Sequence, residues 1–196
     1  MRRLFIIRHG NTFASGEQAR RVGVRTDIPL VESGRIQAEQ LGQWFAQGKL
    51  SVRRILSSPL QRARQTAQSI AAAVGIERAG TCDWLSEIDH GPDEDQPEAA
   101  VLARIGAEAL TRWDEHAIPP DGWIVDVDAR IQAWRTFFAE GGEGIDLLVT
   151  SNGAARFALV AAGLPLRALK LRTGAFGELA VDDARQVSLI RWDVRP

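Results

Sequence analysis

Cysteine is scarce in this sequence. Cys82 is the only cysteine among 196 residues, so no disulfide can form within the chain. A chain without disulfides is typical of a reducing compartment, and we expect a cytoplasmic location. No neighbour of Cys82 would stabilise its thiolate, so we expect a small buried side chain there and not a nucleophile.

Long hydrophobic runs and a strong net charge are also absent. The longest apolar runs, such as 4–7, fall far short of the roughly 20 residues that cross a bilayer. The apolar stretch after Met1 ends at Arg8, which is too short for the core of a signal peptide. The net charge of −1 gives no general attraction to nucleic acid or anionic lipid. We therefore expect a protein that binds neither nucleic acid nor membranes.

Several motifs of known chemistry are missing. The sequence contains no Gly-x-Gly-x-x-Gly, no Walker A loop and no Gly-x-Ser-x-Gly turn. Its three histidines are scattered and do not have the spacing of a metal site. We therefore expect no cofactor and no metal. The content of 45% hydrophobic and 25% charged residues is that of a globular protein, and we expect one domain over 1–196.

Lysine is rare and arginine is abundant. Lys49 and Lys170 are the only lysines among 24 lysine and arginine residues, so the other 22 are arginines. GC-rich coding explains such a bias, and so does a need for guanidinium groups, which bind phosphate or carboxylate through two parallel hydrogen bonds. Composition alone does not separate these explanations, so the positions of the arginines matter.

The hydropathy pattern predicts strands that alternate with helices. Buried strands are predicted at 3–8, 52–57 and 145–150, and a closing hairpin at 176–182 and 186–192. Helices are predicted at 33–47, 59–74, 97–113 and 127–139, with another between Gly153 and Gly163, while 11–31 and 86–97 are predicted loops. This order favours a three-layer α/β/α fold with a mostly parallel central sheet.

Polar side chains follow the predicted strands, where ligands bind in parallel sheets. They lie in Arg8-His9-Gly10-Asn11-Thr12, in 57–67 and in Ser151-Asn152-Gly153, and also in Leu85-Ser86-Glu87, before which we expect a further strand. A neutral imidazole can attack phosphorus, and guanidinium groups can neutralise phosphoryl oxygens. A carboxyl group can protonate the leaving oxygen and later deprotonate a water. The set therefore suits phosphoryl chemistry.

Four segments resemble motifs of the histidine phosphatase superfamily, the phosphoglycerate mutase-like proteins. Residues 8–12 look like its Arg-His-Gly-x-Thr motif, and 57–67 is very similar to its Ser-Ser-Pro-Leu-x-Arg-Ala-x-Gln-Thr-Ala segment. Residues 26–34 resemble its Thr-Asp-x-Pro-Leu…Gly stretch, and 85–91 its Leu-x-Glu-x-x-x-Gly block. The matches keep the family's order from residue 4 to about residue 160, so the resemblance implies a phosphoglycerate mutase-like fold.

The resemblance implies a role for each matching position. His9 would be the phosphorylated nucleophile, and Glu87 the general acid and then the base. The remaining positions would contact phosphate, either through side chains or through backbone N–H groups near a helix N-terminus: Arg8, Gly10, Asn11, Thr12, Arg62 and Gly153. We expect Arg64 and Gln65 to be solvent-facing or structural.

One departure concerns a second histidine, which the family carries in a Thr/Ser-His-Gly sequence. Ser151-Asn152-Gly153 stands there instead. An asparagine amide donates a hydrogen bond but never carries charge. Loss of a charge-stabilising donor costs roughly 100- to 1,000-fold in rate, and because asparagine keeps a donor we expect the lower end or less. Asparagine is also a good N-cap residue, so Asn152 has two compatible interpretations, helix capping and phosphate contact.

A second departure concerns the substrate-facing parts of the family. Residues 92–95 replace its usual aromatic and acidic residues, and 119–123 lacks its Gly-Glu-Ser element. The substrate is therefore left undefined, and a mutase is less favoured than a phosphatase. His90, three residues after Glu87, could return an imidazole to the site, but we expect an exposed loop histidine.

The sequence thus predicts a metal-independent phosphomonoester hydrolase that forms a phosphohistidine on a small phosphorylated metabolite. Its partner is a small phosphorylated substrate or phosphate, and a homodimer stays open. The alternatives are a catalytically weak relative that binds a phosphorylated ligand or partner, and a phosphoglycerate mutase.

Overall fold

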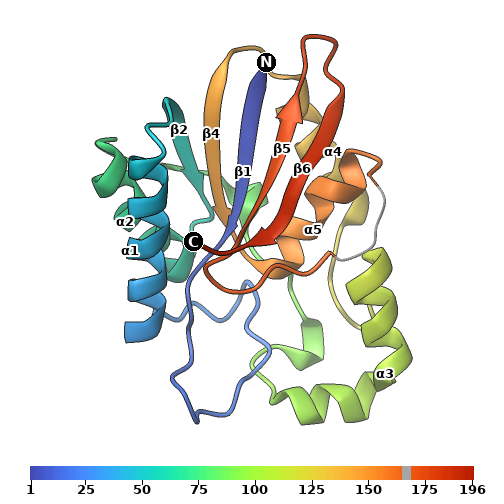
Figure 1. Ribbon diagram of the computed structural model, residues 1–196. Helices are drawn as coiled ribbons and strands as arrows, with labels where there is room; N and C mark the ends of the chain where they lie inside the picture. Colours follow the sequence, from blue (N-terminus) through green and yellow to red (C-terminus); the bar gives the residue numbers. More distant parts are fainter. Residues whose placement is uncertain (165–168) are drawn as a thin grey trace.

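The computed structural model describes residues 1–164 and 169–196. Its centre is a six-stranded sheet in the order β3-β2-β4-β1-β5-β6 (Figure 1). The strands are β1 (Arg2–Arg8), β2 (Val52–Ser57), β3 (Gly80–Thr81), β4 (Gly144–Thr150), β5 (Phe176–Val181) and β6 (Val187–Val194). The pairs β1–β4, β2–β4 and β2–β3 are parallel, whereas β1–β5 and β5–β6 are antiparallel. The predicted α/β fold is confirmed, with a mixed sheet.

Helices cover both faces of this sheet (Figure 1). They are α1 (Glu32–Gln47), α2 (Gln61–Val74), α3 (Glu98–His116), α4 (Val127–Ala139) and α5 (Asn152–Ala161), with short 3-10 helices at Asp83–Leu85 and Gly91–Asp93. One apolar cluster joins α1 and α2 to the sheet through Phe5, Leu41, Phe45 and Ile70, among others. A second cluster packs α3, α4 and α5 on the other face. These two clusters define the three predicted layers.

Two predicted helix boundaries differ from the structure by two or more residues. The second helix begins at Gln61 and not at Pro59, because Leu60 keeps an extended backbone (φ −69°, ψ 140°). It ends, as predicted, before Gly75, whose left-handed backbone (φ 74°) favours glycine. Helix α3 continues to His116, three residues beyond the predicted end, and bends at Gly106, where φ is 80°.

The strand register brings the predicted site segments together. Arg8 of β1 pairs with Thr150 of β4, and Ser57 of β2 pairs with Val149. The residues that follow these strands therefore lie at the same edge of the sheet, as parallel strands require. Among the described residues, no helix is both long enough and apolar enough to cross a membrane.

Candidate active site

His9 follows β1 directly and is only 5% exposed. Its Nδ1 lies 2.7 Å from the carbonyl oxygen of Gly10. A carbonyl only accepts hydrogen bonds, so Nδ1 carries the proton and Nε2 keeps its lone pair. Burial, then the charges of Arg62 and Arg8, lower the pKa of His9 well below 6.5. The imidazole is therefore neutral at physiological pH, with Nε2 as a nucleophilic atom.

Arg62 projects from the first turn of α2 and is fully buried. Its Nε donates to Nε2 of His9 at 3.2 Å, while Nη1 and Nη2 donate to the carbonyls of Thr26 (2.8 Å) and Gly23 (3.1 Å). Burial lowers the pKa of Arg62, with Glu87 the leading opposing charge. Three directed hydrogen bonds thus fix this cation against the nucleophile.

Arg8 supplies a second cation from the end of β1. Its Nη1 donates to the carbonyl of Leu171 at 2.6 Å. Burial lowers the pKa of Arg8 to about 10, so the guanidinium is still charged at neutral pH. Its Nε is buried and has no hydrogen-bond partner among the described residues. Such an unsatisfied donor is uncommon in a folded interior and is typical of functional sites.

A cavity of about 230 Å³ opens over His9. Of the predicted site residues, Arg8, His9, Asn11, Thr12, Glu87, Asn152 and Gly153 all line it. Arg62 does not line it, and reaches the site through its hydrogen bond to His9. The other described residues that line it are Phe13, Ala19, Arg20, Arg21, Val22, His90, Glu98, Trp113 and Thr173.

Glu87 is buried and held at both carboxylate oxygens. Oε1 accepts from the N–H of Ile88 and Oε2 from the N–H of Gly153, both at 2.9 Å. Burial raises the pKa of Glu87, but His90, these two N–H donors and Arg62 together lower it further, so the net shift is downward. Without ligand, Glu87 is therefore a carboxylate.

Gly153 has a different contact from the one that the resemblance implies. Its N–H donates to Glu87 and not into the cavity, and a Cβ at this position would lie 2.3 Å from Oε1 of Glu87. A residue with a side chain would collide with the carboxylate. The N-terminus of α5 therefore holds Glu87 in place. The N–H of Gly10 likewise has an internal partner, Oγ1 of Thr66, at 3.2 Å.

Asn152 is the first residue of α5, and the N-cap is Ser151. The capping interpretation of Asn152 is therefore wrong. Its Oδ1 accepts from the N–H of Leu171 at 2.8 Å, and its Nδ2 donates to no described residue. Since Asn152 lines the cavity, this amide is available to a ligand.

Asn11 and Thr12 both line the cavity, but their side chains differ in their hydrogen bonds. The side chain of Asn11 accepts from Oγ1 of Thr173 and donates from Nδ2 to Oγ of Ser33 at 3.2 Å. Thr12 forms no side-chain hydrogen bond within the described residues. Thr12 is therefore the freer of the two to contact a ligand.

His90 is not the exposed loop histidine that the sequence predicted. It is 3% exposed and lines the cavity. Its ring packs edge-on against Trp123 with centroids 4.6 Å apart, and its Nδ1 lies 3.5 Å from Oε2 of Glu94. The β-bridge between Asp89 and Ile124 brings Trp123 over this loop and covers the histidine.

Glu94 was missed by sequence reasoning. Its Oε1 accepts from the N–H of Gly23 (3.0 Å), the N–H of Arg25 (3.1 Å) and Oγ1 of Thr26 (2.8 Å). Burial raises the pKa of Glu94, but its contacts with His90 and the hydrogen bond from Thr26 lower it to about 2. Glu94 therefore anchors the loop whose carbonyls hold Arg62.

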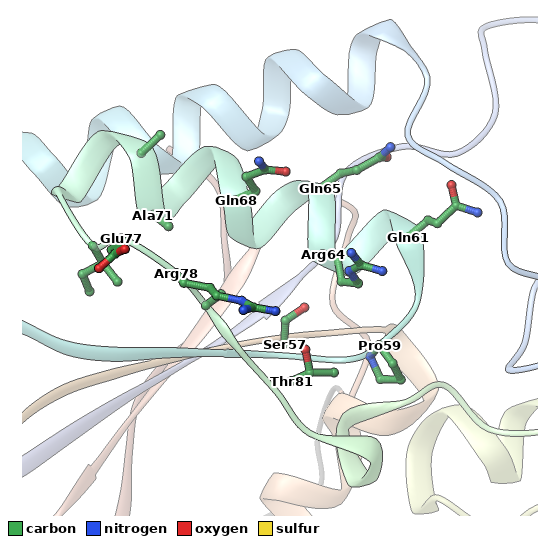
Figure 2. A pocket seen from close by; sticks show the side chains of 13 residues that line it. Ser57, Pro59, Gln61, Arg64, Gln65, Gln68, Ala71, Glu77, Arg78 and Thr81 are labelled. Carbon is green, nitrogen blue, oxygen red and sulfur yellow. The ribbon is translucent and has the colours of Figure 1, made fainter.

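A second hollow of about 930 Å³ lies between α2 and 76–81 (Figure 2). It is larger than the cavity over His9, but the described residues that line it include no histidine or cysteine. Arg64, on its wall, is exposed, and Oε1 of Gln65 accepts from the N–H of Leu30 at 2.8 Å. Among its described lining residues this hollow offers no imidazole or thiol nucleophile, so the cavity over His9 is the candidate active site.

Residues 4–193 match the Histidine phosphatase superfamily (branch 1), and the chain belongs to this superfamily. One relative, from Citrobacter koseri, is a "probable phosphoglycerate mutase GpmB". It is 30% identical over 189 residues, 88% of this chain and 81% of that protein. The protein of the same name from Salmonella choleraesuis (strain SC-B67) is 29% identical over 203 residues, 94% of this chain and 87% of that one.

Solved structures share the fold. A mycobacterial glucosyl-3-phosphoglycerate phosphatase superposes with a TM-score of 0.82, at 22% identity over 100% of both chains. A phosphoserine phosphatase from Entamoeba histolytica, in complex with 3-phosphoglyceric acid, gives 0.77 at 20% identity, over 99% of this chain and 98% of that one. The predicted family and fold are thus confirmed.

Proposed function

We propose that this chain hydrolyses a small phosphomonoester, without a metal, through a phosphohistidine intermediate at His9. The observation that carries the proposal is the imidazole itself. It is neutral, its proton is fixed on Nδ1 by Gly10, and its Nε2 lies beside buried Arg62. Arg8 and Glu87 line the same cavity. A nucleophile, two cations and a carboxyl group are the parts that phosphoryl transfer needs.

In the first step, Nε2 of His9 forms a bond to phosphorus while the bond from phosphorus to the alcohol oxygen breaks. Arg8, Arg62 and the Nδ2 amide of Asn152 stabilise the charge on the phosphoryl oxygens. The carboxyl group of Glu87 gives its proton to the leaving oxygen, so the alcohol departs neutral.

In the second step, a water attacks phosphorus and the bond from phosphorus to Nε2 breaks. Glu87, now a carboxylate, accepts the proton of that water. The products are the alcohol and inorganic phosphate, and His9 returns to its neutral form. One carboxyl group thus acts as acid and then as base.

The acid role requires Glu87 to gain a proton when substrate binds. Without ligand its pKa lies below the ordinary value. A bound phosphate places negative charge beside the carboxylate, and like charges raise the pKa of a carboxyl group. Binding therefore prepares the acid that the first step consumes.

The cavity volume supports a small substrate. At about 230 Å³ it lies below the roughly 300–1,000 Å³ that pockets for drug-sized ligands occupy. The names of the relatives, phosphoglycerate mutase and phosphatases of phosphorylated metabolites, fit a substrate of this size.

Asn152 favours a second candidate function, a catalytically weak protein that binds a phosphorylated ligand. We propose that Asn152 stands where the family has its second histidine, so that one donor to the phosphoryl group is neutral. Binding needs the cations and donors, whereas turnover also needs charge stabilisation in the transition state.

Phosphate release separates these candidates. Wild type and His9→Ala would be assayed with chelator on sugar phosphates, phosphoglycerates, nucleotides and an aryl phosphate. Hydrolysis predicts release by wild type that the variant abolishes. Release no greater than that of His9→Ala on every compound would contradict hydrolysis and favour the binding function.

A further inference from the structure

We propose that Arg130 is a positioning residue for Glu87, and that it holds the backbone segment that carries the Glu87 carboxyl group. The inference rests on the proposed hydrolysis, in which Glu87 protonates the leaving oxygen. Arg130 lies in the first turn of α4, 43 positions after Glu87, and does not line the cavity.

The segment that carries Glu87 needs anchors from elsewhere. Glu87 lies in the 86–90 segment, between the two short 3-10 helices and outside any helix or strand of the sheet. Arg130 donates from Nη1 to the carbonyl of Ser86 at 2.7 Å and from Nη2 to the carbonyl of Glu87 at 3.2 Å. These two carbonyls belong to the peptide groups on either side of the Glu87 Cα atom. Arg130 thus fixes both.

Arg130 is partly buried, and its contacts are unusual for such a cation. Burial lowers its pKa, opposed first by the charge of Glu87. Among the described residues it forms no ion pair, and its Nη1 and Nη2 groups donate to the two carbonyls. Withdrawing a guanidinium from water is costly unless its hydrogen bonds are replaced. The hydrogen bonds of the Arg130 side chain therefore orient one short backbone segment.

The first turn of α4, which carries Arg130, is held by an N-terminal cap. The Asp126 side chain caps α4 by accepting from the N–H of Ala129 at 2.9 Å. This cap fixes the first turn, from which Arg130 projects. The carboxylate of Glu87 depends on the same backbone, because Ile88 donates to it. A rotation of the peptides at 86–88 would move the carboxyl group away from the leaving oxygen.

Loss of this anchor predicts a selective defect. His9, Arg8 and Arg62 are held by β1, α2 and the 23–26 loop, which Arg130 does not contact. Attack on phosphorus would therefore persist, while protonation of the leaving oxygen would weaken. An alkyl phosphate needs that proton. A nitrophenyl phosphate does not, because its leaving group is already a stable anion.

The test compares an alkyl phosphate with p-nitrophenyl phosphate in Arg130→Met, Arg130→Lys and the control Arg135→Met. Arg135 lies on the same helix, is exposed and has no described partner. We expect kcat/KM, which reports formation of the phosphohistidine and not its hydrolysis, to fall in Arg130→Met about 10- to 100-fold on the alkyl phosphate and less than about 3-fold on the aryl one. Lysine has a single ammonium group in place of the two Nη donors, so the loss of kcat/KM in Arg130→Lys should lie between those of wild type and Arg130→Met. Arg135→Met should match wild type.

Three outcomes would overturn the inference. Equal losses on both substrates would assign Arg130 a general structural role. No loss on the alkyl phosphate would exclude positioning. A wild-type enzyme inactive on both substrates would contradict the hydrolase itself, and the inference with it. If Arg130→Met fails to fold, judged by its thermal unfolding, the substrate ratio of Arg130→Lys decides.

Discussion

Nε of Arg62 lies 3.2 Å from Nε2 of His9 and donates a hydrogen bond to it. This contact can form only when Nε2 is unprotonated, since a guanidinium offers donors and no acceptor. The cation therefore selects the neutral, nucleophilic form of the imidazole. For Nε2 to attack phosphorus it must release this hydrogen bond, and Nε of Arg62 can then donate to a phosphoryl oxygen instead.

The first prediction follows from this pair. Arg62→Met removes a positive charge, so the pKa of His9 should rise toward 6.5. NMR titration of the His9 ring nitrogens measures this shift, and wild type should stay neutral with the proton on Nδ1 at pH 6. Arg64→Met, on the same helix but exposed, is the control. An unchanged His9 pKa in Arg62→Met would contradict the proposed electrostatic coupling.

The second prediction concerns Glu94, which anchors the loop that holds Arg62. Glu94→Gln replaces one accepting oxygen by a donor, so the free energy of unfolding at pH 7 should fall by about 2 kcal/mol. Because folding lowers the pKa of Glu94 from 4.5 to about 2, its contribution is complete above pH 4.5 and is lost as pH falls toward 2. The deficit should therefore be smaller at pH 3 than at pH 7.

Urea unfolding at both pH values checks this prediction. Glu39→Gln, an exposed carboxyl on α1, is the control and should show little effect at either pH. In activity, Glu94→Gln should lower kcat/KM about 10-fold, because Arg62 loses its fixed carbonyl partners. A Glu94→Gln variant as stable as wild type at pH 7 would show that the anchor is unimportant.

The third prediction tests the place of Asn152. Asn152→Asp keeps an acceptor for the N–H of Leu171 but turns a donor at the cavity into a negative charge. We expect kcat/KM to fall at least about 100-fold. In Asn152→His, Nδ1 can accept from Leu171 while Nε2–H faces the cavity, so kcat should rise, by up to about 10-fold. Steady-state kinetics of both variants decide, and equal rates for Asp and Asn at 152 would remove this residue from the site.

The fourth prediction concerns the close approach of two loops at the nucleophile. A Cβ on Gly10 would lie 2.2 Å from the carbonyl oxygen of Gly34. Gly10→Ala forces backbone apart and should cost about 3 kcal/mol of unfolding free energy. Gly75→Ala, at φ 74° with open space around it, should cost only about 1 kcal/mol. Denaturant unfolding compares the two, and equal costs would contradict the close-packing argument.

The sequence predicts well what depends on local pattern and strand order. The strand at 52–57 matches its predicted bounds. The rule that ligands sit after parallel strands brought His9, Glu87 and Asn152 to one cavity, as the structure places them. The first success rests on a short stretch of chain, and the second on the order of the parallel strands.

What the sequence does not predict depends on distant partners. The 86–97 segment is polar, which favours exposure of His90, but Trp123 covers it from 33 positions further on. Glu94 binds a loop about 70 positions earlier, and no local motif indicates this contact. Arg130 is one arginine among many on helices, and only the fold brings it to the backbone of Glu87.

The central claim is that Nε2 of His9 takes the phosphoryl group. The most direct test mixes Glu87→Gln with an aryl phosphate, quenches at alkaline pH and locates phosphate by peptide mass spectrometry. Since this variant lacks the base for the second step, we expect phosphohistidine to accumulate at His9 and to be absent in His9→Ala. Release of phosphate without any phosphate on His9 at any time would contradict the account.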